Sequence, residues 1–214
     1  MKKISFLIVS AALLAFCFPQ VLRAQTPAAP DEKQGSQQKK RGGIFTMYAL
    51  DPLSRSLCFN DGKEGRMFVN NQWENRCSDL SYSLAGNGSL VAGLEIDRVA
   101  SIIDLGTSDD LREKYSFDDA ENGGAAFASL RLEGGKITIL HETDPKLVWG
   151  PLKEATQLFT DVRASANAPI KLGHIYLVRL ADVRNKSFEK IVKLMVIGYR
   201  PEEAVTLRWE LLSN

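Results

Sequence analysis

Residues 204–212 read AVTLRWELL, and apolar and polar side chains alternate in this stretch from Val205 to Leu211. A period of two predicts a β-strand with one buried and one solvated face. Two stretches upstream, HIYLVRLAD at 174–182 and KIVKLMVIGY at 190–199, are rich in β-branched and aromatic residues. Short polar connections separate the three stretches and favour antiparallel neighbours, so the C-terminal part of the chain predicts a three-stranded meander.

A second hairpin is predicted where Ala126–Leu132 and Ile137–His141 flank Gly134 and Gly135. The two glycines supply the positive φ angles that a tight hairpin turn needs. Further strand candidates lie between turn-forming residues, and they are Gly43–Leu50, Ser56–Asn60, Arg66–Asn70, Leu80–Leu84, Leu90–Ile96 and Val99–Leu105.

Two short helices are also expected. Ser108 can cap a helix that continues to Tyr115, with acidic residues in its first turn. Pro151 suits the first turn of a second helix that runs to Phe159. Neither helix is long enough to form a layer. We therefore predict a mainly β fold, an antiparallel β-sandwich or barrel of about eight to ten strands with one or two short helices.

The N-terminus has the order of a bacterial secretory signal. Met1–Lys3 is basic, Ile4–Phe18 is apolar and uncharged, and Ala24 offers a small residue for cleavage. The apolar run is shorter than the roughly 20 residues that span a bilayer, which favours cleavage over an uncleaved anchor. Cys17 raises the alternative of a lipoprotein, but Phe16 stands where a small residue is required.

These features divide the chain into a signal peptide at 1–24, a flexible linker at 25–43 and a single β-rich domain at 44–214. The linker is rich in Pro, Gln, Lys and Gly and lacks apolar periodicity, so it buries too little surface to order itself. We expect an exported domain, located in the periplasm, at the cell surface or outside the cell. No stable membrane insertion is expected after the signal is cleaved.

The charge of the chain argues against a nucleic-acid partner. Without residues 1–24 the chain has two more acidic than basic residues, so it has no general attraction for phosphate backbones. We expect a protein or glycan partner in the envelope instead.

Two cysteines remain after cleavage, Cys58 and Cys77. In an oxidising compartment, an even pair close in sequence predicts a disulfide. On the chain-entropy model, such a loop stabilises the fold by about 3 kcal/mol. The alternative is a pair of free thiols, but the Cys-x-x-Cys spacing of redox motifs is absent.

Few residues point to catalysis. The chain has two histidines, His141 and His174, and it lacks the Gly-x-Ser-x-Gly elbow of many serine hydrolases. We therefore predict a non-enzymatic binding or envelope-assembly role, with no cofactor. The alternative is a secreted hydrolase whose site is assembled from distant residues around His141 or His174.

A calcium site and a sugar-binding platform are two further candidate sites. Asp118, Asp119 and Glu121 are candidate calcium ligands, although their spacing differs from an EF-hand and a solvated acidic loop is the alternative. An aromatic platform for a sugar ring is the second site, and its candidates are Trp73, Tyr82 and Trp149.

Overall fold

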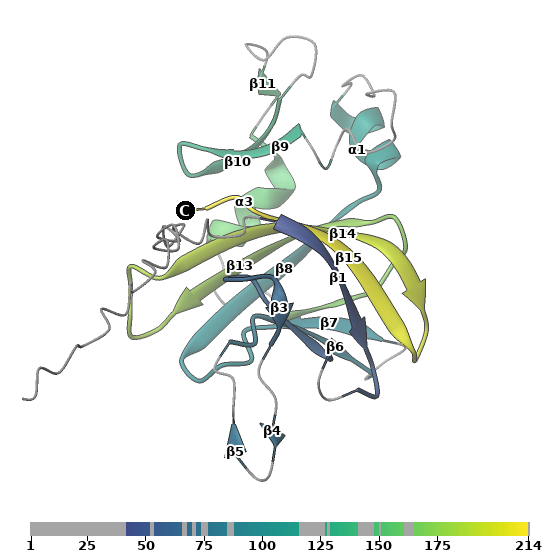
Figure 1. The fold of residues 1–214 in the computed structure, drawn as a ribbon. Helices are drawn as coiled ribbons and strands as arrows, with labels where there is room; N and C mark the ends of the chain where they lie inside the picture. The colour runs from purple at the N-terminus through teal and green to yellow at the C-terminus, as the bar shows by residue number, and fades with distance from the viewer. Residues whose placement is uncertain are drawn as a thin grey trace, which may run out of the picture. The chain divides into compact units, whose positions relative to one another are not determined.

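In a computed structural model of the chain, the three C-terminal strands form the predicted meander (Figure 1). They are β13 (Ile175–Asp182), β14 (Glu189–Arg200) and β15 (Ala204–Leu211), and neighbours pair antiparallel. Two outer strands complete a five-stranded sheet in the order β1-β15-β14-β13-β8, where β1 is Gly42–Tyr48 and β8 is Arg98–Gly106. Burial alternates along β15, as the period of two predicts, and is nearly continuous along β13 and along β14 from Lys190 to Val196.

The chain divides into the units Met1–Gln38 and Lys39–Asn214, and only residues of the second unit are described. The predicted signal peptide and nearly all of the predicted linker lie outside the described residues. The described residues are 42–51, 54–65, 68–69, 72–73, 77–84, 88–115, 127, 129–140, 148–149, 151–160 and 165–213.

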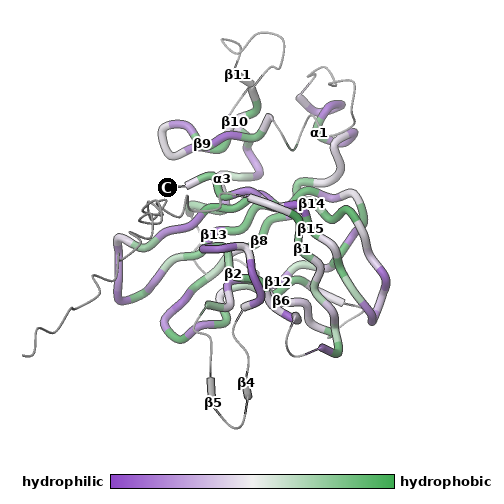
Figure 2. The backbone as a smooth tube through the Cα atoms, in the orientation of Figure 1, coloured by the Kyte–Doolittle hydropathy of each residue, from purple (hydrophilic) through white to green (hydrophobic). Residues whose placement is uncertain are grey.

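A second antiparallel sheet packs on one face of the first. Its order is β12-β7-β6-β2-β3, formed by Asn167–Pro169, Ser89–Ala92, Leu80–Ser83, Ser56–Cys58 and Lys63–Glu64. Side chains of both sheets share one buried cluster, because each sheet turns an apolar face toward the other. Figure 2 shows hydrophobic stretches along the strands and hydrophilic turns at their ends. The shared cluster includes Leu57, Tyr82, Leu90, Val178, Leu194 and Trp209.

Helices and a hairpin cover the other face of the five-stranded sheet (Figure 1). The helices are α1 (Ser108–Tyr115) and α3 (Lys153–Thr160). The hairpin joins β9 (Leu130–Glu133) to β10 (Lys136–Leu140), and β11 (Val148–Trp149) pairs with β10. A separate ribbon pairs β4 (Phe68–Val69) with β5 (Gln72–Trp73). The second core cluster contains Leu111, Phe127, Ile137, Leu158, Ile175 and Leu177.

The mainly β class, the antiparallel sheets and the two short helices are confirmed. The strand segments are more numerous than expected, because several have only two or three residues, and closure as a sandwich or a barrel stays a prediction. No helix in the described part of the chain is long and apolar enough to span a bilayer.

The cap of α1 differs from the sequence prediction. Thr107, not Ser108, caps this helix, because Thr107 Oγ1 accepts a hydrogen bond from Asp110 N at 3.2 Å. Asp110 Oδ2 accepts one in return from Thr107 N at 2.7 Å. Ser108 begins the helix itself, and the reciprocal pair satisfies the amide of Asp110 in the first turn and the amide of the cap residue Thr107.

Candidate functional site

Cys58 and Cys77 are joined by the predicted disulfide, with their Cα atoms 5.3 Å apart. Asp79 lies beside them, and its Oδ2 accepts hydrogen bonds from Phe59 N at 2.8 Å and Lys190 Nζ at 2.7 Å. Two sulfurs and a carboxylate in close proximity resemble a metal-ligand set. The sulfurs are bonded to each other and offer no thiolate, so this cluster stabilises the fold instead of holding a metal.

His174 pairs with a carboxylate at the edge of the larger sheet. It lies directly before β13, and its Nδ1 is 2.8 Å from Asp104 Oδ1 on β8. Lys171 Nζ lies 3.0 Å from Asp104 Oδ2, and Gly106 N donates to Asp104 Oδ1 at 2.9 Å. Burial raises the pKa of Asp104, but the hydrogen bonds from His174, Gly106 and Lys171 outweigh it and hold that pKa below its usual value.

The His174–Asp104 pair has the geometry of an imidazole oriented by a carboxylate. A carboxylate at Nδ1 orients an imidazole so that Nε2 can accept a proton from a nucleophile or a water. His174 pairs with Asp104 and its ring meets that of Tyr176, and in the described part of the chain no serine, threonine or cysteine side chain is hydrogen-bonded to the imidazole. The second predicted histidine, His141, lies outside the described residues.

Among the calcium and sugar-binding candidates, Tyr82 has a described side chain and the others do not. Asp118, Asp119 and Glu121 lie outside the described residues. Trp73 and Trp149 are described as strand backbone only, paired with Phe68 and Ile139.

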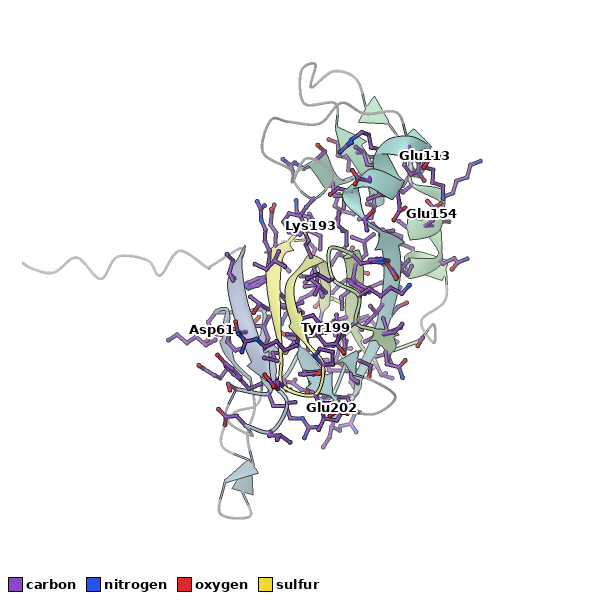
Figure 3. The ribbon with its side chains drawn as sticks, turned by 90° about the vertical axis from the view of Figure 1, so that its right-hand side faces the viewer. Asp61, Glu113, Glu154, Lys193, Tyr199 and Glu202 are labelled. Atoms are coloured by element: carbon purple, nitrogen blue, oxygen red, sulfur yellow. A yellow bond between two sulfur atoms is a disulfide. The ribbon has the colours of Figure 1, made fainter. Side chains whose placement is uncertain are left out.

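Tyr82 is placed in the core, so its predicted role in a sugar-binding surface is wrong. Its side chain is 0% exposed. The hydroxyl accepts a hydrogen bond from Glu202 N at 3.0 Å, and the ring meets Tyr199 edge-on. Tyr199 and Glu202 lie at the end of the strands away from the helices (Figure 3). Tyr82 therefore helps to fix the β14–β15 turn.

Lys193 is a buried charge that the sequence prediction missed. It is 0% exposed, and its Nζ donates to Phe127 O at 2.7 Å and Leu130 O at 3.3 Å and pairs with Glu210 Oε2 at 3.1 Å. Burial lowers the pKa of Lys193 to about 8, although Glu210 opposes the shift. Figure 3 shows Lys193 toward the helical end of the strands. Lys193 shares a strand face with Ile191, which would have indicated its burial.

Three aliphatic side chains protrude from two neighbouring turns, and we call them the turn surface. Leu94 is 50% exposed, Ile96 is 84% exposed and Val183 is 51% exposed. Leu94 and Ile96 were expected in a strand, but β7 ends at Ala92. Asp97 takes a positive φ of 68° in this turn, which turns the chain before β8.

Hydrogen bonds and ion pairs fix the two turns to each other. Val183 N donates to Asp97 O at 2.8 Å, and Arg184 Nε lies 3.1 Å from Asp97 Oδ2. Arg98 pairs with Asp182 on the adjacent strand. A surface fixed in this way loses little conformational entropy when it binds.

Asp182 also accepts hydrogen bonds from backbone amides of the turn that contains Val183. Its Oδ1 accepts hydrogen bonds from Asn185 N at 2.7 Å and Arg184 N at 2.8 Å. The bond from Asn185, with those from Arg184 and the charge of Arg98, holds the pKa of Asp182 below its usual value.

A groove of about 590 Å³ adjoins the turn surface. Val99, Ala181 and Phe188 give it apolar lining, and Arg98 lies 3.5 Å over the Phe188 ring. Charges of both signs complete the lining, from Arg179, Asp182, Lys186 and Glu189. The sequence alone does not show that these aliphatic residues lie on neighbouring turns, because the pairing of β8 with β13 brings the two turns together.

Comparisons of the chain with protein-family models, with curated proteins and with solved structures found no match.

Proposed function

We propose that this chain is an exported, non-enzymatic binding or envelope-assembly domain, and that the turn surface contacts its partner. The observation that carries the proposal is the exposure of Leu94, Ile96 and Val183 on two turns that are held together. Grouped aliphatic side chains in water are unfavourable, and such patches mark interaction sites.

The chemistry of the turn surface favours a protein partner over a glycan. Sugar rings stack on aromatic faces, whereas the three protruding side chains are aliphatic. An apolar centre with charged residues of both signs at its border, such as Lys186 and Glu189, is the usual anatomy of a protein interface.

Export to an envelope or extracellular compartment belongs to the same proposal. The signal-like order of residues 1–24 supports it, and so does a disulfide, because such bonds persist in oxidising compartments. Intact-mass analysis of the exported protein should give a start near Gln25, and a retained Met1 contradicts cleavage.

The partner experiment uses the chain without residues 1–24 as bait in an envelope fraction after chemical crosslinking. The test variant is Ile96→Asp combined with Val183→Asp. The control is Leu172→Asp, because Leu172 is 61% exposed but lies in another turn. We expect the same crosslinked protein with wild type and control, and a loss of at least about tenfold with the test variant. Equal recovery with all three baits overturns the role of the turn surface.

A hydrolase is the second candidate, favoured by the 2.8 Å contact between His174 Nδ1 and Asp104 Oδ1. Its test measures hydrolysis of ester, peptide and glycoside probes by wild type and by His174→Asn. A hydrolase that uses this base should lose about 100-fold or more of its rate in the variant. Equal rates of wild type and variant exclude His174 as the base.

A further inference from the structure

Strand β1 is an edge of the five-stranded sheet with one row of backbone groups turned away from its neighbour. Ala49 N donates to Glu203 O at 2.7 Å, on the side of β15, and Tyr48 N donates to Ser54 O at 3.2 Å, on the other side. Backbone groups alternate in direction along an antiparallel strand. The N–H and C=O groups of Gly42, Ile44 and Thr46 therefore point outward, and within the described residues no backbone hydrogen bond reaches them.

The sequence of β1 leaves this edge unprotected. Edge strands usually carry charged residues, proline or a bulge, because bare edges pair with other strands. The strand reads GGIFTMY, has none of these residues and pairs with β15 in an unbroken register. The opposite edge, β8, differs, because Ile102 N donates to Ser165 O at 3.0 Å and Arg98 begins the strand.

We propose that β1 pairs with β1 of a second copy of this chain, antiparallel and about a two-fold axis at Ile44. Ile44 is the middle residue of the three with outward backbone groups, and the Tyr48 amide is already bonded to Ser54. Gly42 then lies opposite Thr46 of the second copy, and Gly43 opposite Phe45. The pairing forms about six main-chain hydrogen bonds and joins the two sheets into one.

The side chains of β1 suit this register. Ile44 is 64% exposed, and in the pair it meets Ile44 of the second copy directly across the strands. Each larger residue, Phe45 or Thr46, lies opposite a glycine, which leaves room for it. No like charges meet, because β1 contains no charged residue. This inference goes beyond the turn surface, which lies at β8 and β13 and stays free for a partner.

Sedimentation equilibrium of the full exported chain tests the proposal by mass. We expect a dimer at about 100 µM protomer for wild type and a monomer for Ile44→Glu. The introduced carboxylate stands opposite Arg208 within one copy, so the fold is retained, whereas two carboxylates meet in the pair. Leu172→Glu is the control, because Leu172 is 61% exposed, and it should stay dimeric. A monomeric wild type, or a dimer that Ile44→Glu leaves intact, overturns the proposal.

Cysteine crosslinking tests the register. Ile44→Cys should form an intermolecular disulfide, because hydrogen-bonded partners lie about 5.5 Å apart at Cα, within disulfide range. Tyr48→Cys is the matched control, since Tyr48 is also exposed on β1 but does not meet its own copy in this register. Crosslinking of Tyr48→Cys at an equal or higher yield contradicts the two-fold axis at Ile44.

Discussion

Lys190 and Asp79 form a buried ion pair that joins the two main sheets, with Lys190 Nζ 2.7 Å from Asp79 Oδ2. Lys190 lies on β14, and Asp79 directly precedes β6. The residues are 7% and 3% exposed, and Asp79 also accepts the amide of Phe59. The pair therefore fixes the start of β14 in one sheet against the disulfide-bonded end of the other sheet.

Breaking this pair should destabilise the fold strongly. Lys190→Met leaves the Asp79 carboxylate buried without its cation, which costs about 3–5 kcal/mol. Urea unfolding measures the loss. Lys171→Met is the control, because Lys171 pairs with Asp104 but is 51% exposed, and exposed pairs contribute less than about 1 kcal/mol. Similar losses in the two variants contradict the buried role of Lys190.

Removal of the disulfide should lower the free energy of unfolding by less than the loss of the Lys190–Asp79 ion pair does. Cys58→Ala combined with Cys77→Ala frees a loop with a sequence separation of 19 residues. We expect the free energy of unfolding to fall by about 3 kcal/mol, because the unfolded chain gains freedom. Thiol labelling of the denatured wild type without reductant should detect neither cysteine. An unchanged free energy of unfolding in the double variant argues against this stabilisation.

The C-terminal meander was predictable because local pattern and tertiary structure agree there. The predicted strands 174–182, 190–199 and 204–212 match β13, β14 and β15 within one residue at each end. The short strands were not predictable in the same way. Lys63–Glu64 and Asn167–Pro169 carry no strand pattern, and they are extended because longer neighbours pair with them.

The roles of the site residues depend on contacts between distant segments, and the sequence alone does not show which segments meet. Tyr82 is at an inward position of β6, so an aromatic residue that looked suited to a ligand lies in the core. Asp104 and His174 meet only because β8 pairs with β13. The Cys58–Cys77 bond was predictable, since cysteine count and spacing suffice for that inference.

Two adjacent hydroxyl residues allow a direct test of the helix cap. Thr107→Ala should cost about 1 kcal/mol, because Asp110 N loses its side-chain acceptor at the start of α1. Ser108→Ala is the matched control, since the buried Ser108 Oγ has no hydrogen-bond partner among the described residues, and it should leave stability nearly unchanged. Both are measured by urea unfolding. A larger loss from Ser108→Ala than from Thr107→Ala would restore Ser108 as the cap.

Lys193 should make the stability of the fold depend on pH in the alkaline range. Burial lowers its pKa to about 8 in the folded chain, whereas the unfolded value is 10.5. Between these values the unfolded state binds more protons, so the free energy of unfolding rises with pH, by about 3 kcal/mol at most. Below pH 8 both states are protonated, and the unfavourable burial of the charge is fully present.

The measurement compares urea unfolding of wild type and Lys193→Met from pH 7 to pH 10.5. Every other ionisable group is present in both proteins, so the difference between the two curves isolates Lys193. We expect wild type to gain stability relative to the variant as pH rises through 8, because loss of the proton removes a charge that Phe127 O, Leu130 O and Glu210 only partly compensate. Lys136→Met, at an exposed lysine of the β9–β10 hairpin, should show no such difference from wild type. A constant difference between wild type and Lys193→Met across this range means that Glu210 and the two carbonyls hold the pKa of Lys193 at its ordinary value.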